Sequence, residues 1–345
     1  MISSTSLVLH RPRVLFGSLL GWRQTLGDRL RGQGCEVVDV DGHDRQALLQ
    51  ALRDVDIVLC SPQQGFVFDA ELIQAAPRLR AVNSVVIGVE TIDVDACTEA
   101  GVLVANGAIE ENFLGVAEAT VMLILALGLD LKAKERAMRA TGTRPATTRA
   151  RLLREHTVGL IGLGRIGRSV AQRLAAFGVR ILGTDPYVKQ LDGVEIVSLD
   201  ELLGASDVVS IHVMLTRDTR GLIGRKQLGL MKPDAYLINT SRGHIVDESA
   251  LAEALNTGRL AAAAFDTFAD EPTPLSSPLF AVDPDKLILT GHCIAHSARV
   301  PDLLIAAVEE NVLREASGEN PEYMVNPQVL EAWQHRMERL AAQPV

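Results

Sequence analysis

The chain has 345 residues, a length that corresponds to about two domains of ordinary size. Its 34 Lys and Arg residues are outnumbered by 43 Asp and Glu residues, and the net charge of −9 argues against a general nucleic-acid-binding protein, which presents a basic face. Aromatic residues make up only 4% of the chain, which excludes binding by rows of stacked rings. A hydrophobic content of 47% excludes a disordered chain.

The cysteines and the apolar segments indicate a compartment. The four cysteines are scattered without a C-x-x-C pair, and the N-terminal residues lack the pattern of a signal peptide, so we expect free thiols and a cytoplasmic protein. The most apolar window, residues 113–129, is interrupted by Glu118 and Thr120, and we expect a buried helix there rather than a membrane span. No spacing of His, Cys and Asp resembles a metal site, so we expect none.

Short apolar runs alternate with helix-like segments over the first 110 residues. The runs predicted as strands are residues 13–17, 35–40, 56–61, 79–85 and 101–106. Continuous apolar strands that alternate with helices are typical of a parallel sheet covered on both faces. This pattern predicts a first α/β unit.

A second series of apolar runs predicts a second parallel sheet. Its strands are expected at residues 157–164, 180–185, 194–199, 207–213, 235–241, 261–268 and 287–292. Residues 132–154, between the two series, carry eight basic residues and one acid, Glu135. Such a run can bind phosphate or nucleic acid, but no aromatic residues interleave, which favours a solvated arm or a subunit contact. A helix is expected over residues 299–317.

Residues 162–167 read Gly-Leu-Gly-Arg-Ile-Gly, the G-x-G-x-x-G spacing. The pattern follows a predicted strand and opens a predicted helix, and in that context it indicates a dinucleotide site. Gly162 permits a tight turn, Gly164 lets the backbone approach a pyrophosphate, and Gly167 lets helix and strand pack closely. The helix N-terminus, at Arg165 and Ile166, supplies amide donors to the phosphates.

Asp185 ends the next predicted strand. A carboxylate there can accept hydrogen bonds from both hydroxyls of an adenosine ribose and repels a 2′-phosphate. The sequence therefore predicts NAD rather than NADP, although Lys189 lies close enough in sequence to weaken this preference.

Three polar side chains follow the ends of three later strands: Arg242, Glu271 and His292. Taken singly, each has an ordinary interpretation as a surface ion pair, a loop carboxylate or a core histidine. In open α/β sheets, however, ligands bind beyond the carboxyl ends of the strands, so these three positions can converge.

The order of the motifs GLIGLGRIG, HVMLT, LINTSRGHIVDESALAEAL, AFDTFADEP and LTGH closely resembles the D-specific 2-hydroxyacid dehydrogenase family. The resemblance covers residues 80–327 and extends more loosely over the first 80. It implies a Rossmann nucleotide-binding domain of residues 111–299, inserted into a flavodoxin-like substrate-binding domain of residues 1–110 and 300–345. It also implies a homodimer held through the apolar helix and the basic arm.

The same resemblance assigns roles to residues. It implies that Arg242, Glu271 and His292 are the catalytic set, and that backbone donors of Val86, Ile87 and Gly88 bind the substrate carboxylate. It implies that His292, rather than the nearby His296, is the acid. The cofactor-binding residues that we expect are Gly162, Gly164, Arg165, Ile166, Gly167, Asp185, His212, Thr240 and Asp266, the last at the nicotinamide carboxamide.

These residue types suit the reduction of a small 2-keto acid by NADH. His292 as imidazolium donates a proton to the carbonyl oxygen, and in the reverse direction the neutral ring accepts one. Glu271 orients the ring and favours its charged form. Arg242 grips a carboxylate with its two-pronged guanidinium, which a lysine cannot reproduce.

The chain departs from the family pattern at three places. Gly291 and Met214 replace prolines, and Val85, Val86 and Ile87 are expected to crowd the substrate turn, which predicts a substrate other than simple phosphoglycerate. Two alternative functions remain open on this fold: an NAD-sensing interaction protein, and a relative that oxidises formate or an oxyanion.

Overall fold

The computed structural model describes residues 11–17, 21, 23–61 and 67–342. The chain divides into two compact units. The split unit comprises Met1–Glu110 and Ser297–Val345, and the inserted unit comprises Glu111–His296. The last boundary lies three residues before the expected residue 300, because Ser297 already begins the turn into the next helix, its carbonyl accepting a hydrogen bond from the Val300 amide.

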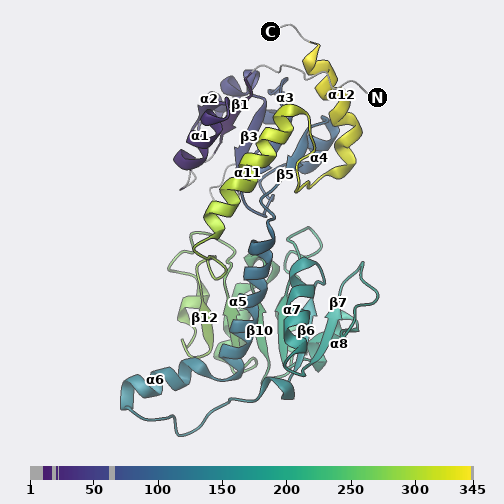
Figure 1. The fold of residues 1–345 in the computed structure, drawn as a ribbon. Helices are drawn as coiled ribbons and strands as arrows, with labels where there is room; N and C mark the ends of the chain where they lie inside the picture. Colours follow the sequence, from purple (N-terminus) through teal and green to yellow (C-terminus); the bar gives the residue numbers. More distant parts are fainter. Residues whose placement is uncertain (1–10, 18–20, 22, 62–66, 343–345) are drawn as a thin grey trace. The chain divides into compact units, whose positions relative to one another are not determined.

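The split unit holds a five-stranded parallel sheet of order β2-β1-β3-β4-β5. Figure 1 labels β1, β3 and β5 of this sheet. Its strands are β1 Arg13–Phe16, β2 Glu36–Asp39, β3 Ile57–Cys60, β4 Ala81–Ser84 and β5 Leu103–Ala105. Its helices are α1 Arg23–Gly32, α2 Arg45–Ala51, α3 Ala70–Gln74, α4 Val94–Glu99, α11 Val300–Ser317 and α12 Leu330–Ala341. This is the flavodoxin-like strand order.

Local sequence explains where several of these helices begin. Asp44, Asp69 and Asp93 each accept a hydrogen bond from the amide three residues on, at 3.0–3.1 Å, so aspartate N-caps start α2, α3 and α4. Helix α12 is not among the elements that the sequence pattern predicts. It is fixed by Trp333, which is 0% exposed and donates through Nε1 to the Arg80 carbonyl at 2.9 Å.

The inserted unit holds a seven-stranded parallel sheet of order β12-β11-β10-β9-β6-β7-β8. Its strands are β6 Thr157–Ile161, β7 Arg180–Thr184, β8 Glu195–Ile196, β9 Val208–Ile211, β10 Tyr236–Asn239, β11 Ala262–Phe265 and β12 Leu287–Leu289. Its helices are α5 Glu110–Gly128, which starts at the boundary, α6 Leu131–Thr141, α7 Arg165–Ala175, α8 Leu199–Ala205, α9 Arg225–Leu230 and α10 Glu248–Asn256. The order in which strands are added to the sheet reverses between β6 and β9, as in doubly wound nucleotide-binding sheets, which confirms the expected fold class.

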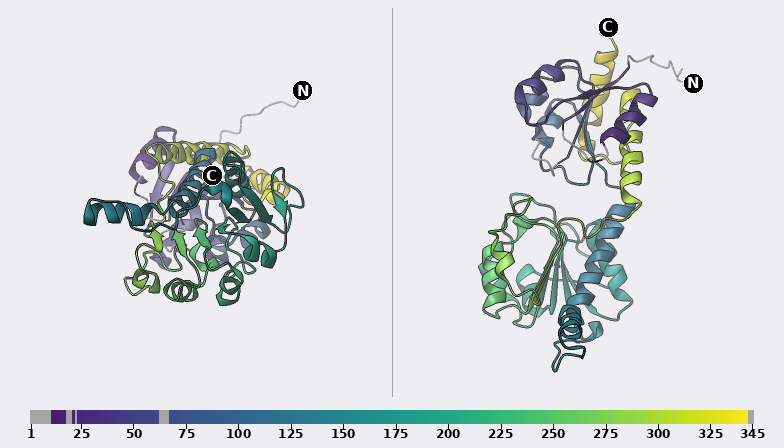
Figure 2. Two further views of the ribbon diagram at one scale, coloured as in Figure 1. Left: turned by 90° about the horizontal axis from the view of Figure 1, so that it is seen from below. Right: turned by 90° about the vertical axis from the view of Figure 1, so that its left-hand side faces the viewer.

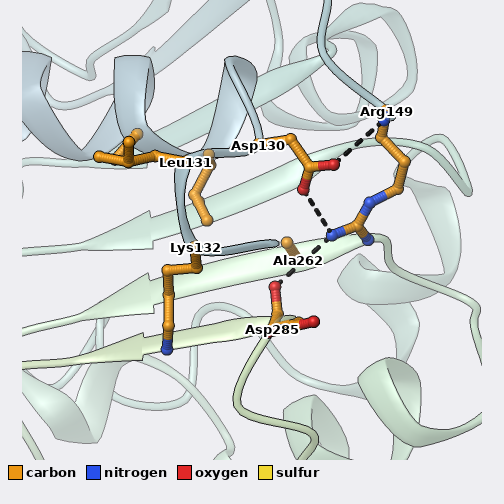
Figure 3. Close-up of a pocket in the computed structure, with 8 residues that line it drawn as sticks. Asp130, Leu131, Lys132, Arg149, Ala262 and Asp285 are labelled. Carbon is orange, nitrogen blue, oxygen red and sulfur yellow. Dashed lines mark hydrogen bonds and ion pairs between the residues drawn. The ribbon is translucent and has the colours of Figure 1, made fainter. Parts of the chain in front are cut away.

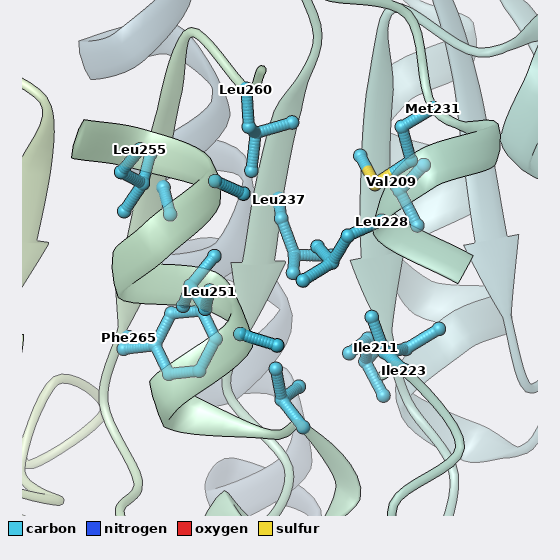
Figure 4. Packing of buried hydrophobic residues seen from close by; sticks show 14 of the residues in the cluster. Val209, Ile211, Ile223, Leu228, Met231, Leu237, Leu251, Leu255, Leu260 and Phe265 are labelled. Carbon is cyan, nitrogen blue, oxygen red and sulfur yellow. The ribbon is translucent and has the colours of Figure 1, made fainter. Parts of the chain in front are cut away.

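Both faces of this sheet are covered, and Figure 2 shows the strands between two helical layers. On β10, Leu237 packs into the cluster with α8, α9 and α10, whereas Ile238 packs into the cluster with α5 and α7. The first of these clusters appears in Figure 4, where Phe265 and Leu251 contribute from β11 and α10. Consecutive apolar residues of this strand are therefore buried on opposite faces of the sheet, as the sequence predicts.

The basic segment 132–154 runs past the amino ends of the strands in the inserted unit. Asp130 contacts both the Arg149 guanidinium, at 3.2 Å, and the Arg149 amide (Figure 3). Lys132 donates to the Leu287 carbonyl at 2.9 Å. Asp285 pairs with Arg136. These ion pairs attach the segment to the protein's own acids, in agreement with an arm rather than a phosphate site.

Helix α5 is, among the described residues, the one helix long and apolar enough to cross a membrane, and 44% of its apolar window is buried in the protein. Its buried side, including Ala117, Leu123 and Ile124, packs against the sheet of the inserted unit. Its other side exposes Met122 (50%), and the exposed Leu129 (40%) follows directly after its last residue. Length and composition alone therefore say little about a membrane, because a core helix passes the same test.

Candidate active site

The predicted site residues of the inserted unit gather at the carboxyl edge of its sheet. Each follows a strand: Asp185 after β7, Gly162 after β6, His212 after β9, Thr240 and Arg242 after β10, Asp266 and Glu271 after β11, and His292 after β12. The sheet order places the glycine turn at the middle of this edge, where the strand order reverses, and the catalytic candidates on the strands to one side. This edge is where open α/β sheets bind ligands.

The glycine turn requires glycine at two of its three glycine positions, Gly162 and Gly167. Gly162 has φ +96°, and a Cβ there would lie 2.7 Å from the His212 carbonyl oxygen. A Cβ at Gly167 would lie 2.1 Å from the Gly162 carbonyl oxygen. The space beside Gly164 is open, with no atom within 4 Å of the place that a Cβ would take. The turn is thus tightly packed at Gly162 and Gly167 and open at Gly164, where a pyrophosphate can approach the backbone.

The first turn of α7 offers amide donors at this opening. Among the described residues, the amides of Arg165, Ile166 and Gly167 have no hydrogen-bond acceptor. They add to the positive end of an 11-residue helix. A dinucleotide pyrophosphate supplies the acceptors that these amides lack, so the local structure fits the predicted cofactor.

Asp185 is held rigidly beside the glycine turn. Its Oδ2 accepts from the Leu163 amide at 2.8 Å, and its Oδ1 accepts from the amides of Tyr187 and Val188. Partial burial acts to raise the pKa of Asp185, but the lowering effect of these backbone hydrogen bonds is larger in sum, and the pKa lies below its usual value. The group is therefore a fixed anion, suited to ribose hydroxyls and repulsive to a 2′-phosphate.

His292 and Glu271 form the closest functional pair. His292 Nδ1 lies 2.7 Å from Glu271 Oε2, and both side chains are 31% exposed. Burial acts to raise the pKa of Glu271, but the hydrogen bonds from His292 and from the Phe268 amide, together with the charge of Arg242, bring it below its usual value. Glu271 is thus an anion that fixes one ring nitrogen of His292 and leaves the other, Nε2, for chemistry.

Asp266 shapes the backbone around His292. Its carbonyl accepts from the His292 amide at 2.6 Å. Its Oδ1 accepts from the Thr290 hydroxyl and from the amides of Cys293 and Ile294. His292 has φ +54°, a left-handed conformation that a non-glycine residue adopts at a cost of about 1–3 kcal/mol. The Asp266 hydrogen bonds hold this strained backbone in place.

Arg242 is positioned from the end of β10. The buried Asn239 side chain donates to the Arg242 carbonyl at 2.9 Å and accepts from the Ser241 amide. Next to Arg242, Gly243 packs so closely that a Cβ would lie 1.9 Å from the Phe268 carbonyl carbon. The charge of Arg242 is one of the influences that lower the pKa of Glu271, as expected for an arginine close to that carboxylate.

His212 and Thr240 take structural positions at the same edge. Burial lowers the pKa of His212 to about 4, so its ring is neutral, and its Nε2 has no partner among the described residues. The Thr240 hydroxyl lies 3.0 Å from that of Thr120 on α5. A direct contact of either residue with the cofactor stays a prediction. Within the described ranges, no three His, Cys, Asp or Glu side chains gather as a metal site.

The substrate loop, residues 86–88, belongs to the split unit and follows β4. Its carbonyls are tied down: that of Val86 accepts from the Gly107 amide at 3.0 Å, and that of Ile87 from the Asn106 side chain at 2.8 Å. Among the described residues, the amides of Val86, Ile87 and Gly88 have no acceptor. The loop therefore presents donors that suit a carboxylate.

The expected crowding of this loop is largely wrong. Val85 is 0% exposed and lies inside the core cluster formed with α1 and α11, and Val86 packs against the same cluster. Only Ile87, which is half-buried and outside every core cluster, is left to meet a ligand.

Two positioning residues are not among those that the sequence motifs predict. Asn239 is fully buried and supports Arg242, and its signal is a polar residue closing an apolar strand. Glu248, in the first turn of α10, accepts from the Ala269 amide at 2.7 Å and so braces the loop that carries Glu271. The rival His296 is exposed and its ring has no partner among the described residues, which favours His292.

Comparisons with known proteins agree with this geometry. Residues 121–293 match the family described as D-isomer specific 2-hydroxyacid dehydrogenase, NAD binding domain. The chain is 39% identical over 293 residues to a D-3-phosphoglycerate dehydrogenase of Mycobacterium tuberculosis, covering 84% of this chain and 54% of that protein. It thus spans about half the length of the phosphoglycerate dehydrogenases that it matches.

Two further relatives are matched over nearly their whole length. A glyoxylate reductase of Thermofilum pendens is 36% identical over 312 residues, which cover 86% of this chain and 90% of that one. The solved structure of a D-lactate dehydrogenase from Aquifex aeolicus, complexed with NAD and lactic acid, superimposes with a TM-score of 0.78 at 27% identity, covering 89% and 96% of the two chains.

Proposed function

Because the chain belongs to the D-isomer specific 2-hydroxyacid dehydrogenase family, and residues 121–293 form that family's NAD-binding domain, we propose that it transfers hydride between NAD(H) and a small D-2-hydroxy acid or 2-keto acid. The observation that carries this proposal is the His292–Glu271 pair, 2.7 Å apart, at the same sheet edge as Arg242 and the glycine turn. The inserted unit is then the cofactor domain and the split unit the substrate domain.

In the direction of reduction, His292 Nε2 donates a proton to the substrate oxygen while the neighbouring carbon is reduced. Bound NADH supplies the hydride. Glu271 holds Nδ1 and stabilises the imidazolium, and the Asp266 hydrogen bonds keep the strained His292 backbone in one orientation. Fixing the acid before the substrate arrives removes part of the entropic cost of the reaction.

Arg242 and the loop amides account for recognition of an anionic substrate by a protein of net charge −9. We propose that the Arg242 guanidinium binds the substrate carboxylate and polarises the adjacent carbonyl. We also propose that the amides of Val86, Ile87 and Gly88 donate hydrogen bonds to a carboxylate. Local donors outweigh the global charge because solvent ions screen distant charges over about 10 Å.

The decisive experiment measures initial rates of NADH consumption with glyoxylate and a series of 2-keto acids of increasing size. We expect turnover with at least one of them, and slower turnover with NADPH because Asp185 is a fixed anion beside the ribose site. An absence of turnover with the whole series, despite measurable NADH binding, would favour the NAD-sensing interaction protein. Turnover of NAD⁺ with formate alone would favour the formate-oxidising relative.

We propose that the protein is a cytoplasmic homodimer joined through the outer face of α5. Its four cysteines are free, as in a reducing compartment. A groove of about 410 Å³ on α5 is lined almost wholly by apolar residues, including Val121, Met122 and Leu125. An exposed apolar surface of this kind is typical of a subunit contact.

Replacing Met122 with aspartate is expected to convert the dimer into a monomer, because a charge buried in an apolar interface loses its hydration without gaining a partner. Sedimentation velocity over a range of concentrations measures the change. The matched control is Phe177→Asp, which places the same charge at an apolar residue that is 41% exposed and lies two residues beyond the last residue of α7. Equal effects of the two substitutions, or a wild-type monomer, would contradict the proposal.

A further inference from the structure

A buried carboxyl group lies beneath the strand that leads into the substrate loop. Glu315, on α11, is 0% exposed, and its Oε2 accepts a hydrogen bond of 2.7 Å from the side-chain amide of Asn83 on β4, which is also 0% exposed. The proposed catalytic mechanism uses neither residue. An ionised carboxylate in such a place needs a cation or several donors to offset the loss of its hydration.

No cation fills that role for Glu315 among the described residues. The charged and thiol groups on the elements that pack around Glu315 have other partners. Arg80 pairs with Asp56 and donates to the Ala316 carbonyl. Arg29 of α1 pairs with Glu309, and the Cys60 thiol of β3 donates to the Asn83 carbonyl. Burial, the larger influence, raises the pKa of Glu315 to about 8, and the hydrogen bond from Asn83 only partly opposes it.

Two buried acceptor atoms are left over in this pair. Oε1 of Glu315 and Oδ1 of Asn83 have no donor among the described residues. One proton on Glu315 satisfies both, because the O–H on Oε1 can donate to Oδ1 while Nδ2 donates to Oε2. The two side chains then form a closed acid–amide pair without any buried charge, which is the arrangement that buried polar groups require.

We propose that Glu315 is a protonated carboxylic acid that forms a neutral, doubly hydrogen-bonded pair with Asn83, and that this pair positions the end of β4 and the substrate loop after it. Asn83 lies two residues before Val85, and the hydroxyl of the intervening Ser84 donates to the Gly88 carbonyl. A displacement of β4 relative to α11 would therefore move the loop amides. The consequence for substrate binding rests on the proposed function, whereas the state of the pair does not.

The pH dependence of stability follows from the direction of the shift. Since the pKa is about 8 in the folded protein and about 4.5 for an ordinary glutamate, the folded state holds the proton more tightly than the unfolded state. The contribution of Glu315 is fully present below pH 4.5 and is lost progressively as the pH rises to about 8. Above that pH the pair carries a buried charge.

The test compares wild type with Glu315→Gln, whose amide can donate to Oδ1 and accept from Nδ2 without titrating. Thermal unfolding is followed from pH 5 to pH 9. We expect equal Tm values at pH 5 and a variant more stable by several degrees at pH 9, because only the wild type loses this contribution. Infrared spectra at pH 6 should show the band of a protonated carboxyl in the wild type that the variant lacks.

A matched control is Glu309→Gln on the same helix, where an ion pair with Arg29 is removed instead. This control should lower Tm at neutral pH and leave the difference between pH 5 and pH 9 unchanged. Parallel Tm–pH curves for wild type and Glu315→Gln, or a missing carboxyl band, overturn the proposal whether or not the protein is a dehydrogenase.

The positioning role has its own measurement. With an active substrate, the ratio of wild-type to Glu315→Gln KM should stay near one at pH 6 and rise above pH 8, while the ratio of kcat changes little. A KM ratio that is constant over this range would show that the pair stabilises the domain without positioning the loop. If no substrate is found, the unfolding and infrared measurements still decide the state of Glu315.

Discussion

Replacing His292 with glutamine is expected to lower kcat for keto-acid reduction by about 10²–10⁴, the usual contribution of a positioned general acid. Glutamine fills a similar volume and can still accept from its surroundings, but it cannot transfer a proton to the developing alkoxide. Steady-state rates at saturating substrate measure the loss. NADH binding should change little, since the ring does not lie at the glycine turn.

His296→Gln is the matched control, because the same substitution is made four residues away on the same loop. Its kcat should stay within a factor of a few of the wild-type value. Persistent turnover in the His292 variant together with loss of turnover in the His296 variant would reverse the assignment of the acid.

Glu271→Gln tests how the acid is kept charged. In the wild type, the low pKa of Glu271 keeps its carboxylate ionised as the pH falls. The negative charge beside His292 is therefore present in the acidic range as well. Without that charge the imidazolium is less stable, and the alkaline limb of the pH–rate profile for reduction should move to lower pH. A profile that only drops in height, without moving, would show that Glu271 orients the ring but does not tune its charge.

Much of the site could be predicted because its residues follow strands that periodicity reveals. Short runs rich in apolar residues precede Gly162, Asp185 and His292, and such runs are typical of strands in a parallel sheet covered on both faces. Once the sheet is parallel, all carboxyl ends share one edge, and the residues after them converge without further information.

Other features could not be predicted, since they depend on distant partners. Glu315 reads as an ordinary helix residue, and only its contact with Asn83, more than 200 positions away, reveals an uncharged acid. The inward turn of Val85 depends on α11 in the same way. Helix α12 escapes prediction because its anchors, Trp333 and Arg336, donate to backbone carbonyls more than 200 positions earlier in the chain.

Arg242→Lys is expected to lower kcat/KM by about 10- to 100-fold. A lysine keeps the positive charge but offers a point donor in place of a planar fork, so at least one hydrogen bond to a charged group, worth about 1.5–3 kcal/mol, is lost. Because the same guanidinium is proposed to polarise the carbonyl, kcat should fall together with a rise in KM. Arg242→Ala should lose more, since no charge remains.

The control for Arg242 is Arg225→Lys, at an exposed arginine of α9 that pairs with Glu253. An exposed ion pair contributes little, and kinetics should match the wild type. A rise in KM with unchanged kcat in Arg242→Lys would mean that Arg242 binds the substrate equally in the ground and transition states. An unchanged kcat/KM would show that Arg242 does not bind the substrate, and carboxylate binding would then be assigned to the loop amides alone.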